Sequence, residues 1–274
     1  MSSVKPAVID LEAVALLARK VCEAVHLPLF RQGVKGEEKS PGELVSEVDR
    51  RAERLLVEGL ADLTPGLPVV GEEAASDDPS LMGALQGSTP VWLVDPLDGT
   101  SQFLNGSPDY AVMLALVQAG TVLAAVVHQP QHQRTYMAEL GSGTWRDGVR
   151  LWTASGAEAL ADIRGAVLRR FLDEPARQSV AANEWMFGDL TPATTCAGIE
   201  YPRIVEGEAD FLLFWRTLAW DHAPGALLLR EAGGVAVRPD GADYRPDDAR
   251  SGLLAASDQA TANRVLQGLG VKCR

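Results

Sequence analysis

The sequence predicts an α+β first half joined to an α/β second half within a single chain of 274 residues. In the first half, two long amphipathic helix patterns precede a series of closely spaced apolar stretches, which is typical of consecutive strands. In the second half, patterns of helices and strands alternate. No repeat, low-complexity segment or obvious linker interrupts the chain. We therefore expect one domain over residues 1–274, with subdomains of about 1–150 and 151–274.

Two helices are predicted at the start of the chain. Apolar residues recur at helical spacing over residues 8–27, and a second amphipathic pattern covers residues 45–63 before Pro65-Gly66 stops it. Between these helices, residues 31–42 are rich in glycine and charge, which predicts a mobile loop.

Strand predictions dominate the rest of the first half. Residues 77–88 predict a surface loop or a short helix. The Asp147-Gly148 pair is a hairpin signal before the last of the strands. The predicted strands are 69–70, 91–94, 110–117, 122–128, 134–138 and 149–152.

The second half alternates more evenly between the two kinds of element. Asp221 is predicted to open a helix that Gly233-Gly234 stops. The predicted strands are 163–168, 209–214 and 252–256, and the predicted helices are 199–205, 221–232 and 259–269.

Composition excludes some classes of function. The formal net charge is −12 and the pI is about 4.8, which argues against non-specific binding to nucleic acid or to an anionic membrane. Bound metal ions can still invert the charge of a single site. The cysteines Cys22, Cys196 and Cys273 are odd in number and far apart, which favours reduced thiols in a cytoplasmic protein. Asp10 and Glu12 make the N-terminus a poor signal peptide.

The most informative segment is Asp95-Pro96-Leu97-Asp98-Gly99-Thr100, which directly follows a buried strand. Asp95 stands at the end of that strand, and Asp98 follows three residues later, so both carboxylates can face one point. Gly99 allows a close approach of the backbone, and Thr100 can begin a helix whose free N–H groups bind phosphate. An ordinary Asp-Gly turn with Asp95 as a cap explains this fragment equally well when it is taken alone.

Other acidic residues accompany this segment. Glu72 and Glu73 follow a short strand, Asp49 lies on the second predicted helix, and Asp221 lies at a helix start. Each has a plain alternative. Glu72 and Glu73 can be solvated, Asp49 can be a surface residue of its helix, and Asp221 can be an N-cap.

Together these segments resemble the inositol monophosphatase family. The motifs occur in the family's order and approximate spacing, and the resemblance extends from Lys39 to about Ala256. It implies a layered α-β-α-β-α sandwich of the inositol monophosphatase and fructose-1,6-bisphosphatase type, usually a homodimer and inhibited by Li⁺. The motifs are Asp95-Pro-Leu-Asp98-Gly-Thr100, Gly71-Glu72-Glu73, the segment around Asp49, and Trp220-Asp221 with Gly233-Gly234 downstream.

The resemblance also implies Mg²⁺ as the cofactor, in two or three ions, with Mn²⁺ as a possible substitute. Glu72, Asp95 and the backbone carbonyl of Leu97 would bind a first ion. Asp95, Asp98 and Asp221 would bind a second, and Glu72 would share a third. The donor chemistry agrees, because all these ligands are hard oxygens and none is His or Cys.

The implied catalytic residues are Asp49, Thr100 and Glu72. Thr100, paired with Asp49, would orient the water that attacks phosphorus, and Asp221 would position a water that protonates the leaving group. The backbone N–H groups of Gly99 and Thr100 would hold the phosphate oxygens.

Two further residues have open interpretations. Lys39 matches a family lysine on the loop near the metals, but a solvated lysine explains it equally well. His222 is the only histidine that we expect near the site, and packing at the helix start is favoured over contact with substrate.

The resemblance weakens where the leaving group would bind. The family's Gly-Ser/Thr-Ala segment corresponds to Thr195-Cys196-Ala197-Gly198, which makes Ala197 a substrate contact, and Phe214 replaces a glutamate that binds polyol hydroxyls. Phe214, Trp215 and Arg216 therefore indicate a flatter leaving group, or one with a second anionic group. The alternative is that Phe214 and Trp215 are core strand residues. Gln102-Phe103, after the Asp-Gly-Thr motif, assigns no subfamily.

We therefore expect Mg²⁺-dependent hydrolysis of a small phosphorylated metabolite, with an inositol-monophosphatase-like activity ranked first. Histidinol-phosphate phosphatase is the second choice, and nucleoside 3′,5′-bisphosphates and sugar bisphosphates are further candidate substrates. A non-catalytic metal-binding regulator is the alternative from another class, although the intact acidic motifs argue against lost activity. A dinucleotide-binding oxidoreductase is discounted, because no Gly-x-Gly-x-x-Gly follows the first strand.

Overall fold

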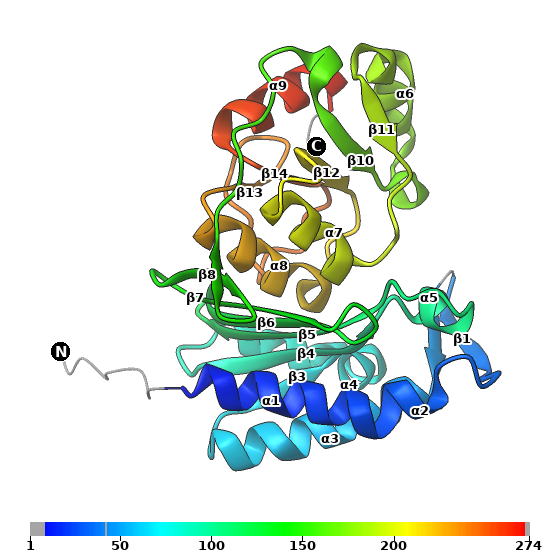
Figure 1. Cartoon of the computed structure of the whole chain (residues 1–274), viewed down its shortest axis with the longest axis vertical. Helices are drawn as coiled ribbons and strands as arrows, with labels where there is room; N and C mark the ends of the chain where they lie inside the picture. Colours follow the sequence, from blue (N-terminus) through cyan, green and yellow to red (C-terminus); the bar gives the residue numbers. More distant parts are fainter. Residues whose placement is uncertain (1–8, 42, 272–274) are drawn as a thin grey trace.

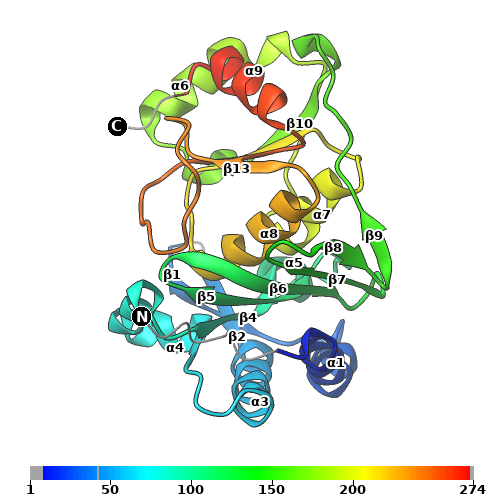
Figure 2. The same cartoon turned by 90° about the vertical axis from the view of Figure 1, so that its left-hand side faces the viewer.

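The computed structural model describes residues 9–41 and 43–271, and Figure 1 shows them arranged in five layers. In order, these are an outer helix pair, a seven-stranded sheet, a middle helix pair, a five-stranded sheet and a second outer helix pair. Figure 2 shows the same layers after a quarter turn. The helix pairs are α1 (Leu11–Val21) with α3 (Glu47–Leu63), α7 (Ala197–Val205) with α8 (Ala219–Glu231), and α6 (Glu174–Asn183) with α9 (Gln259–Leu269). The predicted α-β-α-β-α sandwich is confirmed.

The seven-stranded sheet follows the chain order from β3 to β9. All neighbouring strands are antiparallel except β3 and β4, which are parallel. The carboxyl ends of β3 and β4 therefore meet at one edge of the sheet, which is where ligand sites in such sheets form. The strands are β3 (Val69–Gly71), β4 (Val91–Asp98), β5 (Ala111–Gln118), β6 (Thr121–Gln129), β7 (Arg134–Glu139), β8 (Gly143–Arg146) and β9 (Val149–Leu151).

The five-stranded sheet is mixed and has the order β11-β10-β12-β14-β13. Its strands β10, β12 and β14 correspond to predicted strands, whereas β11, β13 and helix α6 were not predicted. The strands are β10 (Arg164–Val167), β11 (Asp189–Thr191), β12 (Phe211–Phe214), β13 (Val235–Val237) and β14 (Leu253–Ala256). The chain passes from one sheet to the other between Leu151 and Arg164, and the division into subdomains near residue 150 stays a prediction.

Strand β4 shows why the first sheet is covered on both faces. All eight of its residues are buried, so the strand lacks a polar face. Trp92 and Val94 pack into the core beneath α1 and α3, whereas Val91 and Leu93 belong to the core on the side of α8. This alternation is the period of two that a strand imposes.

The structure corrects the prediction of a mobile loop over residues 31–42. Its second part forms strand β1 (Gly36–Ser40), which pairs with β2 (Glu43–Ser46) in a separate two-stranded sheet. Gly42 lies outside the described residues. The glycine and charge content suggested a loop, because β1 is exposed or half-buried and lacks an apolar pattern, whereas β2 ends in the buried residues Val45 and Ser46.

Helix α3 begins at Glu47 and α7 at Ala197, each two residues from the predicted start, and two other helices also differ from the prediction. The first helix continues from α1 into a π-helical turn, Cys22–His26, and then into α2 (Leu27–Leu29). Helix α8 begins at Ala219, with Leu218 at its N-cap, so Asp221 lies in the first turn and does not cap the helix. Two short helices at the carboxyl ends of β3 and β4 complete the site region, α4 (Glu72–Asp77) and α5 (Thr100–Leu104).

Of the helices in the described parts of the chain, none has both the length and the hydrophobicity that crossing a bilayer requires.

Candidate active site

Two acidic side chains meet where β3 and β4 end. The strands are parallel and Gly71 pairs with Val94, so Glu72 and Asp95 follow at neighbouring positions. The Asp95 residue is only 2% exposed. Burial raises the pKa of Glu72 to about 7, although Lys39 opposes the shift. Burial and the charge of Glu72 also raise the pKa of Asp95 well above its ordinary value. Together these carboxylates form a site that favours a bound cation.

Asp98 ends β4 and is held by the middle helix layer. Its Oδ2 accepts hydrogen bonds from the Gly198 amide at 2.5 Å and from the Cys196 thiol at 3.0 Å. Burial raises the pKa of Asp98 to about 7, although both hydrogen bonds lower it. Gly99 then turns the chain with a φ of 86°. A Cβ at this position would lie 3.0 Å from the carbonyl oxygen of Asp109, so the turn requires glycine.

Asp221 reaches the same cavity from the first turn of α8. Burial raises its pKa to about 8; the charge of Asp98 adds to the shift and that of Arg216 opposes it. The carboxylates of the cavity are named here the acidic wall, which consists of Glu72, Asp95, Asp98 and Asp221.

Thr100 and Asp49 form a fixed pair beside the acidic wall. The Thr100 hydroxyl lies 2.9 Å from Asp49 Oδ1 and 3.1 Å from the carbonyl oxygen of Leu97. Asp49 Oδ2 accepts the Ser46 amide at 2.8 Å and the Ser46 hydroxyl at 2.6 Å, as part of the capping box of α3. Asp49 is 1% exposed, so it is not a surface residue of its helix.

Lys39 lies on strand β1 and contacts the acidic wall directly. Its Nζ is 2.6 Å from Glu72 Oε1 and 3.0 Å from Glu73 Oε1. Burial disfavours the charge of Lys39, but the two glutamates outweigh that effect and raise its pKa. The solvated alternative for Lys39 is therefore wrong, because its side chain is 14% exposed and doubly paired.

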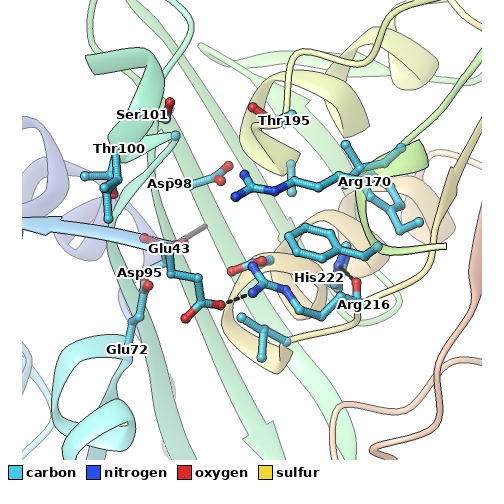
Figure 3. Close-up of a pocket in the computed structure, with 18 of the residues that line it drawn as sticks. Glu43, Glu72, Asp95, Asp98, Thr100, Ser101, Arg170, Thr195, Arg216 and His222 are labelled. Atoms are coloured by element: carbon cyan, nitrogen blue, oxygen red, sulfur yellow. Dashed lines mark hydrogen bonds and ion pairs between the residues drawn. The ribbon is translucent and has the colours of Figure 1, made fainter. Parts of the chain in front are cut away.

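The opposite side of the cavity is cationic and aromatic. Figure 3 shows Arg170 and Arg216 reaching toward the carboxylates from the side that faces Glu43 and Glu72. The Arg216 guanidinium lies 4.1 Å from the centre of the Phe171 ring, and that of Arg170 lies 5.2 Å from it. These three residues, Arg170, Phe171 and Arg216, are named here the cationic wall.

Glu43 connects the β1–β2 hairpin to the cationic wall. Its carboxylate forms an ion pair with Arg216, drawn as a dashed line in Figure 3. The two residues are 173 positions apart in the sequence. Sequence reasoning missed Glu43, Arg170 and Phe171, since none of them belongs to a motif or to a strongly periodic element.

Two buried histidines support the site from behind. His26 Nε2 lies 2.9 Å from the carbonyl oxygen of Pro96, in the middle of the Asp95–Asp98 segment. His222 Nε2 lies 3.2 Å from the carbonyl oxygen of Arg216, and its ring packs edge-on against Phe214. His222 also lines the cavity, but its contacts are those of a packed residue, as expected. The expectation that only His222 lies near the site was wrong, because His26 contacts the central motif.

The structure brings most of the predicted site residues to one cavity. Asp49 lies behind it through Thr100, and Lys39 touches it through Glu72. Phe214 is both a buried strand residue and a cavity residue, whereas Trp215 packs in the outer core. The predicted residues that line the cavity are Glu72, Asp95, Leu97, Asp98, Gly99, Thr100, Ala197, Phe214 and Asp221.

Three of the four carboxylates of the acidic wall have hydrogen-bond or ion-pair partners within the protein. Asp95 Oδ1 accepts the Leu97 amide, Asp98 Oδ2 accepts the Gly198 amide, and Glu72 pairs with Lys39. Consistent with this, no three His, Cys, Asp or Glu side chains among the described residues are arranged to hold a metal ion as they stand. Each of these contacts engages one oxygen of a carboxylate, so lone pairs on the second oxygen remain for a cation.

The chain is similar to known proteins in both sequence and fold. The sequence matches the inositol monophosphatase family over residues 7–270. The fructose-1,6-bisphosphatase/inositol-1-monophosphatase of Thermotoga maritima is 27% identical over 263 residues, which cover 90% of this chain and 94% of the relative. The Nus factor SuhB of Pseudomonas aeruginosa is 32% identical over 227 residues, which cover 80% and 81%. The solved structure of the Thermotoga maritima IMPase TM1415 has a TM-score of 0.81 at 25% identity, covering 95% of this chain and 96% of that one.

The five-layer fold and the acidic cavity at the ends of β3 and β4 define the class of layered phosphatase-like sandwiches. Within this class, the chain belongs to the inositol monophosphatase family, which confirms the resemblance inferred from the motifs. Among its relatives are proteins named as phosphatases and proteins named as Nus factors.

Proposed function

We propose that this protein hydrolyses a small phosphate monoester in a Mg²⁺-dependent reaction, as an inositol-monophosphatase-like phosphatase. The observation that carries the proposal is the convergence of the acidic wall on one cavity beside Thr100. Two or three ions would be held by the acidic wall together with the backbone carbonyl of Leu97, and Mn²⁺ would substitute for Mg²⁺.

The donor set fits this cofactor. Every proposed ligand atom is a carboxylate or carbonyl oxygen, which Mg²⁺ and Mn²⁺ prefer, and no histidine nitrogen is among them. The raised pKa values of the carboxylates support the same conclusion, since burying them together is unfavourable without a compensating cation. When bound, such ions supply charge neutralisation for the phosphoryl group and acidify water.

Thr100 and Asp49 orient the attacking water. Asp49 is fixed by Ser46 and accepts a hydrogen bond from the Thr100 hydroxyl, so the lone pairs of Thr100 Oγ1 are left to accept a hydrogen bond from water. A water held in this way presents its own lone pair to the phosphorus atom. The backbone N–H groups of Gly99 and Thr100, at the start of α5, support the phosphate oxygens.

The leaving group would lie between Asp221 and the opposite side of the cavity. Asp221 holds the water that returns a proton to the leaving oxygen. Ala197 and Phe214 contact the leaving group, and the apolar ring of Phe214 favours a group other than a simple polyol. Ranked by the family resemblance, the candidate substrates are inositol phosphates, histidinol phosphate, nucleoside 3′,5′-bisphosphates and sugar bisphosphates, and the Phe214 contact argues against the first of them.

A phosphate-release screen over those four ester classes tests the proposal. Purified protein is assayed with Mg²⁺ alone, with Mg²⁺ and excess EDTA, and with Mg²⁺ and Li⁺. We expect turnover of at least one ester, loss of turnover with EDTA and inhibition by Li⁺. Folded protein that releases phosphate from none of the esters would contradict the proposal.

A non-catalytic role is the second candidate. It is favoured by one observation, the name Nus factor SuhB given to a relative that is 32% identical. Folded protein that binds Mn²⁺ at the acidic wall but fails the turnover screen would support this role.

We further propose a homodimer in the cytoplasm. Several large apolar side chains are exposed at the β8–β9 edge of the first sheet, including Trp145, Val149 and Trp152, and such patches are typical of interfaces. Both described cysteines are free thiols, and Cys273 lies outside the described residues. Light scattering of wild type and Trp152→Ser tests the dimer. A wild-type monomer would contradict it.

A further inference from the structure

The cationic wall is a compact unit at the mouth of the cavity. Arg170 and Phe171 belong to a short 3₁₀-helix, Arg169–Phe171, and Arg216 follows strand β12. Both guanidinium groups lie over the same aromatic ring, at 4.1 Å and 5.2 Å from its centre. A ring that stacks with arginine restricts the plane of the guanidinium and leaves its edge donors available.

Solvent exposure separates this wall from a buried structural cluster. The Arg216 side chain is 33% exposed, and Arg170 is exposed. They face the cavity of a chain whose net charge is −12. In such a chain, Arg170 and Arg216 confine the positive charge of the cavity to one side, where a bound anion would lie apart from the acidic wall.

Glu43 shows which chemistry Arg216 binds. The Arg216 guanidinium is paired with the carboxylate of Glu43, which extends into the cavity from the β1–β2 hairpin. The backbone of Arg216 is fixed independently, through its carbonyl and His222 Nε2 at 3.2 Å. Arginine has five N–H donors in a planar fork that matches carboxylate and phosphate, so one carboxylate does not exhaust them.

We propose that the cationic wall is a binding subsite for a second oxyanion, a phosphate or a carboxylate, on the leaving group of the substrate. The inference rests on the proposed function, because it requires the scissile phosphate to lie on the acidic wall. Arg216 and Arg170 then act as specificity residues that select an ester with an anionic leaving group over an ester with a neutral leaving group.

Three glucose derivatives that differ only at carbon 6 test this subsite. Glucose 1-phosphate has a neutral hydroxymethyl group there, glucuronic acid 1-phosphate has a carboxylate, and glucose 1,6-bisphosphate has a phosphate. Their affinities are measured by calorimetry with Ca²⁺ in place of Mg²⁺, and their kcat/KM values with Mg²⁺. We expect at least one of the two esters with an anionic group at carbon 6 to bind about tenfold more tightly than glucose 1-phosphate.

Arginine variants assign this preference to the wall. Arg216→Ala and Arg170→Ala should each remove most of it while changing the affinity for glucose 1-phosphate less than about threefold. Arg169→Ala is the matched control, because Arg169 pairs with Glu184 and is not among the cavity residues. Arg170 is exposed, so its variant should fold even if loss of the Arg216–Glu43 pair destabilises the other.

The outcomes separate this inference from the proposed function. If only one of the two esters with an anionic group at carbon 6 binds more tightly than glucose 1-phosphate, that ester identifies the second group as phosphate or as carboxylate. Equal binding of all three esters by wild type, or an equal loss for all three in both variants, would overturn the subsite and leave the wall a structural partner of Glu43. Absence of turnover across the four ester classes of the phosphate-release screen would refute the proposed hydrolysis, while the affinities for the three glucose esters still decide the subsite.

Discussion

The two walls of the cavity are built in different ways. The acidic wall stands at the ends of two buried parallel strands and in the first turn of α8. The cationic wall stands on a short 3₁₀-helix and on the residue after β12, and both of its arginines are accessible to solvent. Rigid strand ends suit groups that need fixed geometry, whereas connecting segments tolerate change. The proposals above accordingly assign phosphoryl chemistry to the acidic wall and the choice of leaving group to the cationic wall.

A buried histidine supports each wall. His26 contacts the carbonyl of Pro96 in the acidic segment, and His222 contacts the carbonyl of Arg216. Burial lowers the pKa of His26 to about 4 and that of His222 to about 3, so both are neutral near pH 7. The predictions below test whether the walls can be altered separately.

The largest effect is expected from Asp98→Asn in the acidic wall. The amide can still accept a hydrogen bond from the Gly198 amide, so folding should be preserved. Loss of the charge should lower kcat/KM by a factor on the order of 10³, measured by phosphate release with Mg²⁺. Asp62→Asn, an exposed position on α3, is the control. Near-normal turnover of Asp98→Asn would defeat the metal assignment.

Low pH should reduce the free energy of unfolding by protonating the buried His26, which contacts the Pro96 carbonyl. The pKa of His26 is about 4 in the folded protein against an ordinary value of 6.5, so the unfolded state binds more protons between these pH values. This contribution to the unfolding free energy is present above pH 6.5 and is lost as the pH falls toward 4, by on the order of 3 kcal/mol. Urea unfolding at pH 7 and pH 4.5 measures the loss. His26→Gln should lose less than wild type, and equal losses would contradict the neutral state.

Thr100→Val should separate water orientation from metal binding. The change removes the hydroxyl that Asp49 holds, with little change in volume. We expect kcat to fall by a factor on the order of 10², with the Mg²⁺ concentration for half-maximal activity nearly unchanged. Thr100→Ser should restore much of the activity, since it keeps the hydroxyl. A valine variant with wild-type kcat would exclude Thr100 from the reaction.

His26→Gln should also weaken metal binding at a distance. The histidine holds the Pro96 carbonyl at 2.9 Å, and loss of such a support typically reduces metal affinity about tenfold. The half-maximal Mg²⁺ concentration in the turnover assay measures this effect. His128→Gln is the matched control, because His128 is also buried but bonds to Thr135. Equal shifts in the two variants would mean that His26 has only a general role in stability.

The smallest effect is expected on the cationic wall, from Phe171→Leu. The substitution keeps an apolar side chain but removes the ring under both guanidinium groups. Cation–π contacts at exposed sites contribute about 0.5–1 kcal/mol. The KM for an ester with an anionic leaving group should therefore rise a few-fold at constant kcat. A change in kcat, or in the Mg²⁺ requirement, would show that the walls are not independent.

The sequence predicted the site residues best where they are adjacent in the chain or directly follow neighbouring strands. Asp95 to Thr100 form one segment, and Glu72 follows a strand that runs parallel to β4. The structure adds contacts between distant residues, such as His26 with Pro96 and Glu43 with Arg216. No local pattern encodes such pairs.

Several short strands were also missed because no local sequence pattern marks them. Strands β11 and β13 have only three residues each, which is too short for a period-two pattern to be read. Strand β1 (Gly36–Ser40) has no apolar side chain, so its pairing with β2 depends on backbone hydrogen bonds that composition does not reveal.

Anomalous diffraction from crystals grown with Mn²⁺ is the most direct test of the acidic wall. The wall predicts at least two manganese peaks within ligand distance of its four carboxylates, one of them also bound by the Leu97 carbonyl. A fully occupied manganese elsewhere on the protein, with none in this cavity, would contradict the proposed metal centre.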